Sequence, residues 1–103
     1  MLLVNINHIP GKEFEVLGMV KGTVVQSKHF GKDFMAGMKT LVGGEIVGYT
    51  EMLVEARQIA TKRMVDEAEA MGADAVICVR YGSASLMSSA AEVVAYGTAV
   101  KFK

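Results

Sequence analysis

The chain has 103 residues and a mass of 11.0 kDa, and we expect residues 1–103 to form a single domain. Its 11 Lys and Arg side chains balance 11 Asp and Glu side chains, and a pI near 6.7 excludes the strongly basic class of nucleic-acid-binding domains. No run approaches the ~20 apolar residues of a membrane-spanning helix. The single cysteine excludes an internal disulfide and any zinc site built from several cysteines of one chain.

The apolar content is high for so small a chain. Hydrophobic residues make up 51% of the sequence, and the mean hydropathy is +0.33. A domain of this mass buries only about 65% of the surface of its unfolded chain, so its interior is small. An apolar excess then stays exposed as a patch or is buried against a partner. We therefore expect the chain to associate with copies of itself. The alternative is a tightly packed monomer rich in Ala and Val.

The first 28 residues favour β-strands. The apolar segment Leu2–Ile6 predicts a short strand, which ends before the turn-forming pair at residues 10–11. Apolar residues alternate over Glu13–Lys28, which predicts a long strand. Gly18 and Gly22 lie inside this strand. Interior glycine is typical of a bulge or of a close approach by another part of the backbone.

Two helices are predicted in the middle of the chain. The apolar spacing over Phe30–Val42 predicts a short helix, which Gly43-Gly44 ends. Over Glu45–Met71, apolar residues recur every three or four positions, which predicts a long helix with one apolar side. Gly72 follows directly, as glycine often does after a helix. The apolar positions are Tyr49, Met52, Leu53, Ala56, Ile59, Ala60, Met64, Ala68 and Met71.

Two further strands are predicted at the C-terminal end, over Asp74–Met87 and Glu92–Phe102. Alternation divides the first of them into two apolar faces. One face holds Ala75, Ile77, Val79 and Tyr81, and the other holds Val76 and Cys78.

The predicted fold class is α+β with two layers. We expect an antiparallel sheet of three to four strands, with the long helix packed on one face plus the short helix, in the order β-α-α-β-β. The second sheet face would then be exposed in a monomer and buried in a ring of subunits. It would carry Leu17, Met19, Val25 and Val76.

Six short phrases are spread in order over nearly the whole chain. They are Gly18-Met19-Val20-Lys21-Gly22, Val42-Gly43-Gly44-Glu45, Tyr49-Thr50-Glu51, Glu55-Ala56-Arg57, Met71-Gly72-Ala73-Asp74-Ala75-Val76 and Ala95-Tyr96-Gly97-Thr98-Ala99-Val100. Together they resemble the YbjQ-like family of small bacterial and archaeal proteins. The resemblance implies a small α+β fold that assembles as a homopentamer. It also brings the family's label, "putative heavy-metal-binding", with no established biochemical role and no catalytic residues.

The metal label can be weighed against the residues present. A soft-metal site needs thiolate, thioether or imidazole ligands that converge in space, and the chain offers Cys78, His8 and His29 as candidates. No Cys-x-x-Cys motif is present. Cys78 lies among apolar strand residues and is interpreted as a small core residue, and both histidines are interpreted as solvated loop residues. A ring of subunits could still bring one His or Cys from each copy together at its axis.

Two further features could contact an anion or lie at an interface. Gly43, Gly44 and Glu45 open the predicted long helix, whose free N–H groups could hold an anion, although the Lys and Ser/Thr of a P-loop are missing. The simpler interpretation is a turn followed by a carboxylate that the helix dipole favours. Arg57 lies beside the apolar side of the helix. It could contact an anion or pair with Glu45 or Glu92.

Three functional hypotheses follow. The first is a homo-oligomeric binding module that holds a heavy-metal ion or a small ligand at subunit interfaces. The second is a non-catalytic scaffold that acts through protein contacts alone. The third is an enzyme with a site shared between subunits, which is the least supported because no nucleophile–base pair stands out. The absence of disulfide capacity and of a signal peptide favours a cytoplasmic protein.

Overall fold

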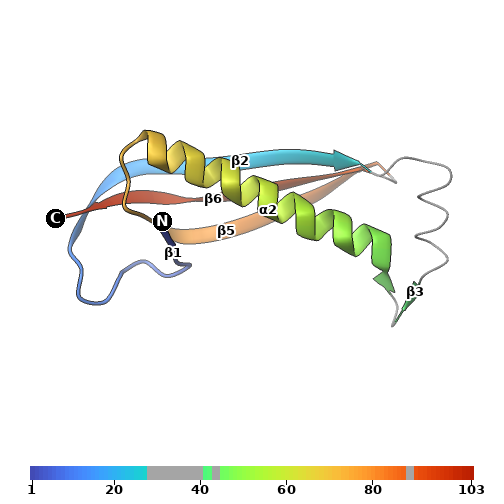
Figure 1. The fold of residues 1–103 in the computed structure, drawn as a ribbon, viewed down its shortest axis with the longest axis horizontal. Coiled ribbons are helices and arrows are strands. Elements are labelled where there is room, and N and C mark those ends of the chain that lie inside the picture. Colours follow the sequence, from blue (N-terminus) through green and yellow to red (C-terminus); the bar gives the residue numbers. More distant parts are fainter. Residues whose placement is uncertain (28–40, 43–44, 88–89) are drawn as a thin grey trace.

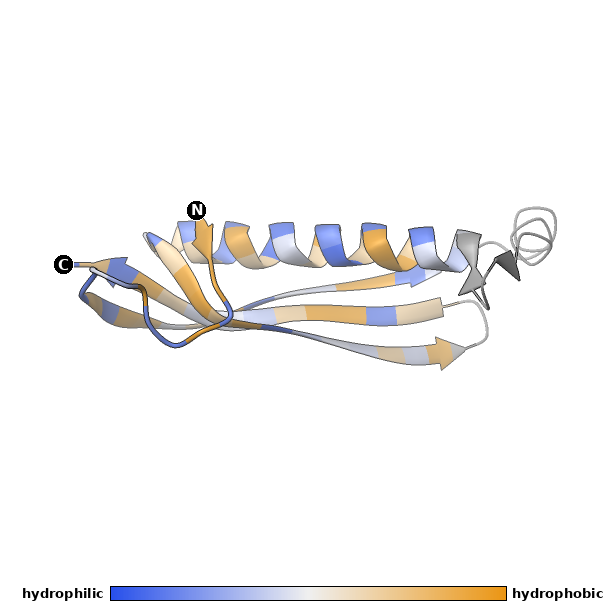
Figure 2. Ribbon diagram, turned by 90° about the horizontal axis from the view of Figure 1, so that it is seen from below, coloured by the Kyte–Doolittle hydropathy of each residue, from blue (hydrophilic) through white to orange (hydrophobic). Residues whose placement is uncertain are grey.

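A long helix lies across one face of a four-stranded sheet in the computed structural model, which describes residues 1–27, 41–42, 45–87 and 90–103 (Figure 1). The main sheet has the strand order β1-β5-β6-β2, and β3 and β4 pair separately. Figure 2 shows the helix and the main sheet as two layers. The elements are β1 (Leu2–Leu3), β2 (Phe14–Ser27), β3 (Leu41–Val42), β4 (Glu45–Ile46), α2 (Val47–Ala70), β5 (Ala75–Met87) and β6 (Ala90–Phe102).

The main sheet is mixed, so the prediction of a purely antiparallel sheet was wrong. Strands β2, β6 and β5 pair antiparallel, whereas β1 runs parallel to β5, with Leu2 opposite Ala75 and Leu3 opposite Val76. Parallel neighbours need a long connection between them. The chain supplies one here, because β2 and α2 both lie between β1 and β5 in the sequence.

The predicted order β-α-α-β-β was also wrong in the middle of the chain. Leu41–Val42, the end of the predicted short helix, forms β3 and pairs with β4, and the rest of that prediction lies outside the described residues. The long helix begins at Val47 rather than at Glu45. Two-residue strands joined through Gly-Gly are too short to give a periodic signal, although Gly-Gly between apolar residues is a hairpin signature.

The buried side of α2 is built from alanine and methionine residues at every fourth position. Met52, Ala56, Ala60, Met64 and Ala68 are at most 3% exposed. This confirms the predicted apolar side of the helix, since residues four apart lie one above the other on a helix surface. The sheet residues that complete this core are Val20, Val24, Val76, Val79, Val93, Ala95 and Ala99.

Gly22 sets how closely the helix approaches β2. A Cβ atom added there would lie 2.1 Å from the carbonyl oxygen of Ala60 and 2.4 Å from the amide nitrogen of Met64. The guanidinium of Arg63 donates to the carbonyl oxygen of Thr23 at 2.7 Å, directly beside this contact. The prediction that glycine within this strand marks a close backbone approach is therefore confirmed at Gly22.

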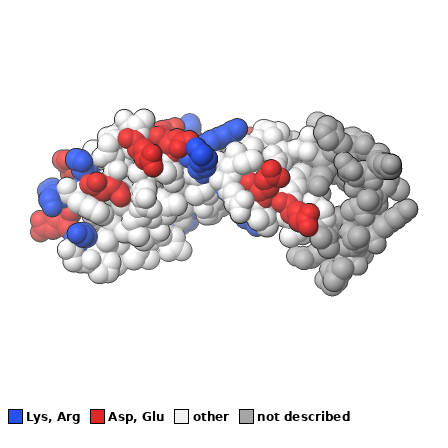
Figure 3. Space-filling view, viewed as in Figure 1, with Lys and Arg blue, Asp and Glu red and all other residues white. Residues whose placement is uncertain are grey.

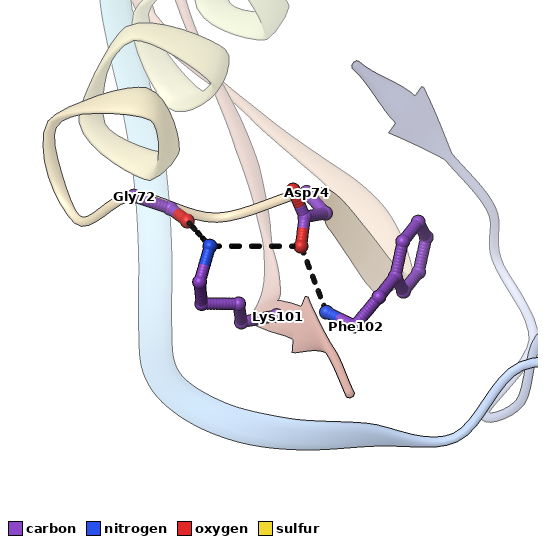
Figure 4. Close-up of polar contacts among 4 residues, drawn as sticks. All are labelled: Gly72, Asp74, Lys101 and Phe102. Atoms are coloured by element: carbon purple, nitrogen blue, oxygen red, sulfur yellow. Dashed lines mark hydrogen bonds and ion pairs between the residues drawn. The ribbon is translucent and has the colours of Figure 1, made fainter.

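Asp74 fastens the end of the helix to the end of β6 (Figure 4). Its carboxylate accepts a hydrogen bond from the amide of Phe102 at 2.8 Å and lies 3.8 Å from the ammonium group of Lys101. Lys101 also donates to the carbonyl oxygen of Gly72 at 3.3 Å. Gly72 itself has a φ of 78°, and the amide of Ala73 donates to the carbonyl oxygen of Ala68, as expected for a glycine-capped helix end.

Bulges reverse the two faces of β2 and β5 part-way along their length. In β2 the register shifts between Val16 and Gly18, so Phe14 packs on the sheet face opposite to Val20. In β5 the register shifts between Ile77 and Arg80, where Cys78 has a φ of 55°. A bulge adds one residue to a strand and thereby breaks the alternation of its side chains.

The bulge in β5 overturns one predicted set of neighbours. Ala75 and Ile77 face away from the helix, whereas Val79 lies in the helix-side core with Val76. The single face predicted for Ala75, Ile77, Val79 and Tyr81 was therefore wrong, because it assumed uninterrupted alternation.

The N-terminal segment covers one end of the sheet face that the helix leaves free. Ile9 packs there against Ala75, Ile77 and Val100 in a second apolar cluster, which also contacts Phe14, Cys78 and Phe102. Backbone hydrogen bonds hold this segment in place. The amides of Cys78 and Val79 donate to the carbonyl oxygens of Ile6 and Val4, and Arg80 donates to that of Asn5.

Candidate functional site

The rest of that sheet face has no covering element among the described residues, and we call it the open face. Because Val20, Gly22 and Val24 face the helix, the alternate residues of β2 face away from it. They pair with the outward residues of β6, for example Met19 with Thr98 and Lys21 with Tyr96. The open face is formed by Met19, Lys21, Thr23 and Val25 of β2 and by Glu92, Val94, Tyr96 and Thr98 of β6.

Large apolar side chains on the open face are exposed to solvent. Met19 is 72% exposed, Val25 is 58% exposed and Tyr96 is 39% exposed. Met19 and Val25 were correctly predicted to lie on the second face. Val76 was not, because it is fully buried beneath the helix, and Leu17, at the bulge, packs against the helix-side core.

A groove lies on the helix side of the sheet, between α2 and β5, and we call it the α2–β5 groove. It is wide open to solvent and has a volume of about 520 Å³. Its helix wall is a stripe with the spacing i, i+3, i+4, i+7 and i+8, next to the buried stripe. Its lining residues are Val54, Arg57, Gln58, Thr61 and Lys62 of the helix and Tyr81 of β5.

Two hydrogen bonds order the polar groups at the centre of this groove. The hydroxyl of Thr61 donates to the carbonyl oxygen of Arg57 at 2.7 Å, one helical turn back. The hydroxyl oxygens of Thr61 and Tyr81 are 2.8 Å apart. Since Thr61 has only one hydroxyl hydrogen, the Tyr81 hydroxyl donates to Thr61. The Tyr81 oxygen therefore keeps its acceptor capacity toward the groove.

The charge of the groove lining is positive. Arg57 and Lys62 line it, and no carboxylate does. Lys62 is paired with Asp66 at 2.9 Å on the exposed helix surface. The guanidinium of Arg57 has no hydrogen-bond or ion-pair partner within the described part of the chain, so it does not pair with Glu92 of its own chain. Pairing with a neighbouring copy stays a prediction. Elsewhere on the face shown in Figure 3, positive and negative side chains are mixed.

Arg57 and Tyr81 also border a second, smaller hollow of about 200 Å³. Its other lining residues are Leu53, Gly82, Ser83 and Val93. The two hollows meet at the Arg57–Tyr81 pair, so this pair lies between an open groove and a more enclosed recess.

The metal candidates do not come together in one chain as far as it is described. Cys78 is half-buried at the β5 bulge in an apolar cluster, and His8 is exposed, with a ring nitrogen 3.3 Å from the side-chain oxygen of Asn7. His29 lies outside the described residues. No group of three or more His, Cys, Asp or Glu side chains in the described ranges could hold a metal ion. This donor set does not fit a soft-metal site within a single described chain.

The predicted anion site at the start of the helix lies largely outside the described residues. Glu45 belongs to β4 and pairs with Val42, two residues before the helix begins, and Gly43 and Gly44 lie outside the described residues. Of the four anion or interface candidates, Arg57 alone lines a hollow among the described residues. Sequence reasoning did not single out Thr61 or Tyr81, because neither belongs to a motif, and their hydrogen bond became evident only from the fold.

A family model described as "Putative heavy-metal-binding" matches residues 1–103. The chain belongs to the YbjQ-like family. It is 59% identical over 101 residues to a UPF0145 protein of Clostridium novyi, covering 98% of both chains. It is 61% identical over 104 residues to a UPF0145 protein of Fervidobacterium nodosum, covering 100% of this chain and 96% of the relative.

A solved structure supports the fold. The chain is similar to a protein of unknown function from Pediococcus pentosaceus, described as a member of the DUF74 family, with a TM-score of 0.67. The similarity covers 100% of this chain and 98% of that one at 14% sequence identity. No helix in the described ranges is long and apolar enough to cross a membrane.

Proposed function

We propose that this YbjQ-like chain is a homo-oligomeric binding module that associates through its open face and holds a small ligand on the helix side of the sheet, rather than at the contacts that the open face makes. The observation that carries the proposal is the exposure of Met19, Val25 and Tyr96 on a sheet face that no described element covers. Burying these side chains against another copy is favourable, because it removes apolar surface from water.

The area of the chain supports association. Its accessible surface is 6491 Å². A compact monomer of the same mass would expose roughly 5,600 Å², so the excess is about 900 Å². That excess is close to the ~800 Å² that each partner contributes to an interface of standard size. The elongated shape, 53 × 25 × 17 Å, leaves a long face available for such contacts.

The open face also has charges of both signs. Lys21 of β2 and Glu92 of β6 both lie on it. In the sheet register, Lys21 is opposite Tyr96 and Glu92 is opposite Val25. Such a face can contact a neighbouring copy in a ring, because each charged group on it can meet an opposite charge on a different surface of that copy. A ring of five copies agrees with the family resemblance, and a cytoplasmic location belongs to the same proposal.

A small ligand is favoured over a metal ion because the described donor residues do not converge, whereas two hollows meet at Arg57 and Tyr81. Native mass spectrometry of protein purified without a chelator, together with elemental analysis, tests the proposal. We expect a multiple of the 11.0 kDa chain mass with no stoichiometric metal. A monomer overturns the assembly, and a stoichiometric soft metal overturns the preference for a small ligand. A scaffold without a ligand is supported if the multimer carries nothing and no small-molecule probe binds.

A further inference from the structure

We infer that the α2–β5 groove binds an organic anion with a flat apolar body, whose acidic group pairs with Arg57. This inference rests on the proposed small-ligand function and specifies the chemical class of the ligand and its place on the chain. It does not depend on where copies of the chain meet, because the groove and the open face lie on opposite sides of the sheet.

The negative group of the ligand is indicated by the charges. The groove lining has two cations and no carboxylate, and Lys62 is already paired with Asp66. The guanidinium N–H groups of Arg57, in contrast, form no hydrogen bond or ion pair within the described residues. A guanidinium presents its N–H groups as a planar fork that matches the two oxygens of a carboxylate or phosphate.

The apolar body is indicated by the walls. Tyr81 is 48% exposed and Val54 is 40% exposed, and both residues line the groove. A flat group placed between them buries apolar surface on both of its sides. The volume of about 520 Å³ falls within the range of small-molecule sites, roughly 300–1,000 Å³.

A polar substituent on the ligand also has a partner. Because Thr61 donates to the carbonyl oxygen of Arg57 and Tyr81 donates to Thr61, the Tyr81 oxygen can accept a hydrogen bond from a ligand hydroxyl or amine. The enclosed recess beyond Arg57 and Tyr81 offers about 200 Å³ for a group longer than one ring. The site thus combines one cation, one acceptor and an apolar wall.

The test uses benzoate as the probe, followed by NMR of the ¹⁵N-labelled full chain. We expect benzoate to bind with a low-millimolar dissociation constant and to shift the amide signals of Arg57, Thr61 and Tyr81. Benzamide keeps the flat ring without the charge, and inorganic phosphate keeps a charge without the ring. We expect both to bind roughly tenfold more weakly than benzoate or worse, because each lacks one of the two contacts.

Variants show whether benzoate binding depends on Arg57 or only on the overall charge of the chain. Arg57→Gln should weaken benzoate binding roughly tenfold or more. The dissociation constant of Arg57→Lys should lie between those of the wild type and Arg57→Gln, because lysine keeps the charge and loses the planar fork of N–H groups. Lys103→Gln removes one positive charge far from the groove and should leave the dissociation constant within about twofold, because exposed charges far apart are screened. The amide spectrum shows whether each variant is folded.

The outcomes distinguish this inference from the proposed function. Equal binding of benzoate and benzamide, unchanged binding by Arg57→Gln, or shifts confined to residues outside the groove would each overturn the inference. Native mass spectrometry of the same samples reports assembly independently. A multimer without benzoate binding removes the inference and leaves the assembly, whereas a monomer that binds benzoate through Arg57 keeps the inference and removes the interface role.

Discussion

Replacing Gly22 by alanine tests whether close contact between α2 and β2 holds the two layers together. The added Cβ would lie 2.1 Å from the carbonyl oxygen of Ala60, 2.4 Å from the amide nitrogen of Met64 and 2.8 Å from the Cβ of Arg63. Two of these atoms belong to the helix backbone and cannot rotate away. Raising 2.1 Å to 3.4 Å, where ordinary contact begins, requires the helix to move by about 1.3 Å.

The expected cost follows from that displacement. Overpacking a core costs about 1–3 kcal/mol. We expect Gly22→Ala to lie at the upper end of this range, because moving packed atoms apart by about 0.5–1 Å already loses a quarter to a half of their dispersion energy. Alanine recovers about 0.4–1 kcal/mol by restricting the unfolded chain. We therefore predict that Gly22→Ala lowers the free energy of unfolding by about 2–3 kcal/mol and the Tm by roughly 10–20 °C.

Urea titration at one fixed protein concentration measures this change. Alanine substitutions at two other glycines serve as comparisons. At Gly97 the added Cβ would lie 2.7 Å from a side-chain carbon of Val76 and 2.9 Å from the carbonyl oxygen of Ile77, so an intermediate loss of about 1–2 kcal/mol is expected. At Gly82 the nearest atom is 3.4 Å away, and the stability should stay within about 0.5 kcal/mol of wild type. Equal stabilities of Gly22→Ala and Gly82→Ala would refute the reasoning.

Substitutions at three further positions test other contacts. Asp74→Ala should cost about 1–2 kcal/mol in urea unfolding, because the amide of Phe102 loses its acceptor, while Asp74→Asn should cost less; equal losses would contradict this. Lys101→Gln should change stability by less than about 0.5 kcal/mol, since its ion pair is long and exposed, and a larger loss would show that the pair matters more than its geometry implies. Cys78→Val should destabilise the chain by at least about 1 kcal/mol more than Cys78→Ala, because a β-branched residue is disfavoured at a φ of 55°; if Val is tolerated as well as Ala, Cys78 does not need its left-handed conformation.

The extent of the long elements could be predicted from the sequence. Alternation over Glu13–Lys28 and Asp74–Met87 gave strands that the structure confirms as Phe14–Ser27 and Ala75–Met87. The helical spacing over Glu45–Met71 predicted a helix that the structure confirms as Val47–Ala70. These segments are long enough for their period to outweigh any single residue.

The faces beyond the bulges could not be predicted in the same way. Gly18 did signal an irregularity, and the structure confirms one there. Cys78 gave no such signal, because non-glycine residues rarely adopt a positive φ. A count that continues alternation through Cys78 therefore places Tyr81 on the same face as Ala75 and Ile77, which the structure separates. The Arg57–Tyr81 site was therefore visible in the sequence only through Arg57, and its partner became evident from the fold.

The open face was foreseen in outline from composition. The apolar excess predicted surface that one small domain cannot bury, and Met19 and Val25 were placed on it from their alternation in β2. The sequence could not show which part of the second face the N-terminal segment covers. That covering depends on hydrogen bonds from the β5 bulge to Val4 and Ile6, which involve backbone groups alone.

Sedimentation velocity of the wild-type chain beside Met19→Glu and Val54→Glu tests the central claim most directly. Both substitutions place a carboxylate at an exposed apolar position, but Met19 lies on the open face and Val54 lies on the helix side. We predict that the wild type and Val54→Glu sediment as one multimer and that Met19→Glu shifts toward the 11.0 kDa monomer. A wild type that sediments as a monomer, or a multimer that Val54→Glu dissociates and Met19→Glu does not, would contradict association through the open face.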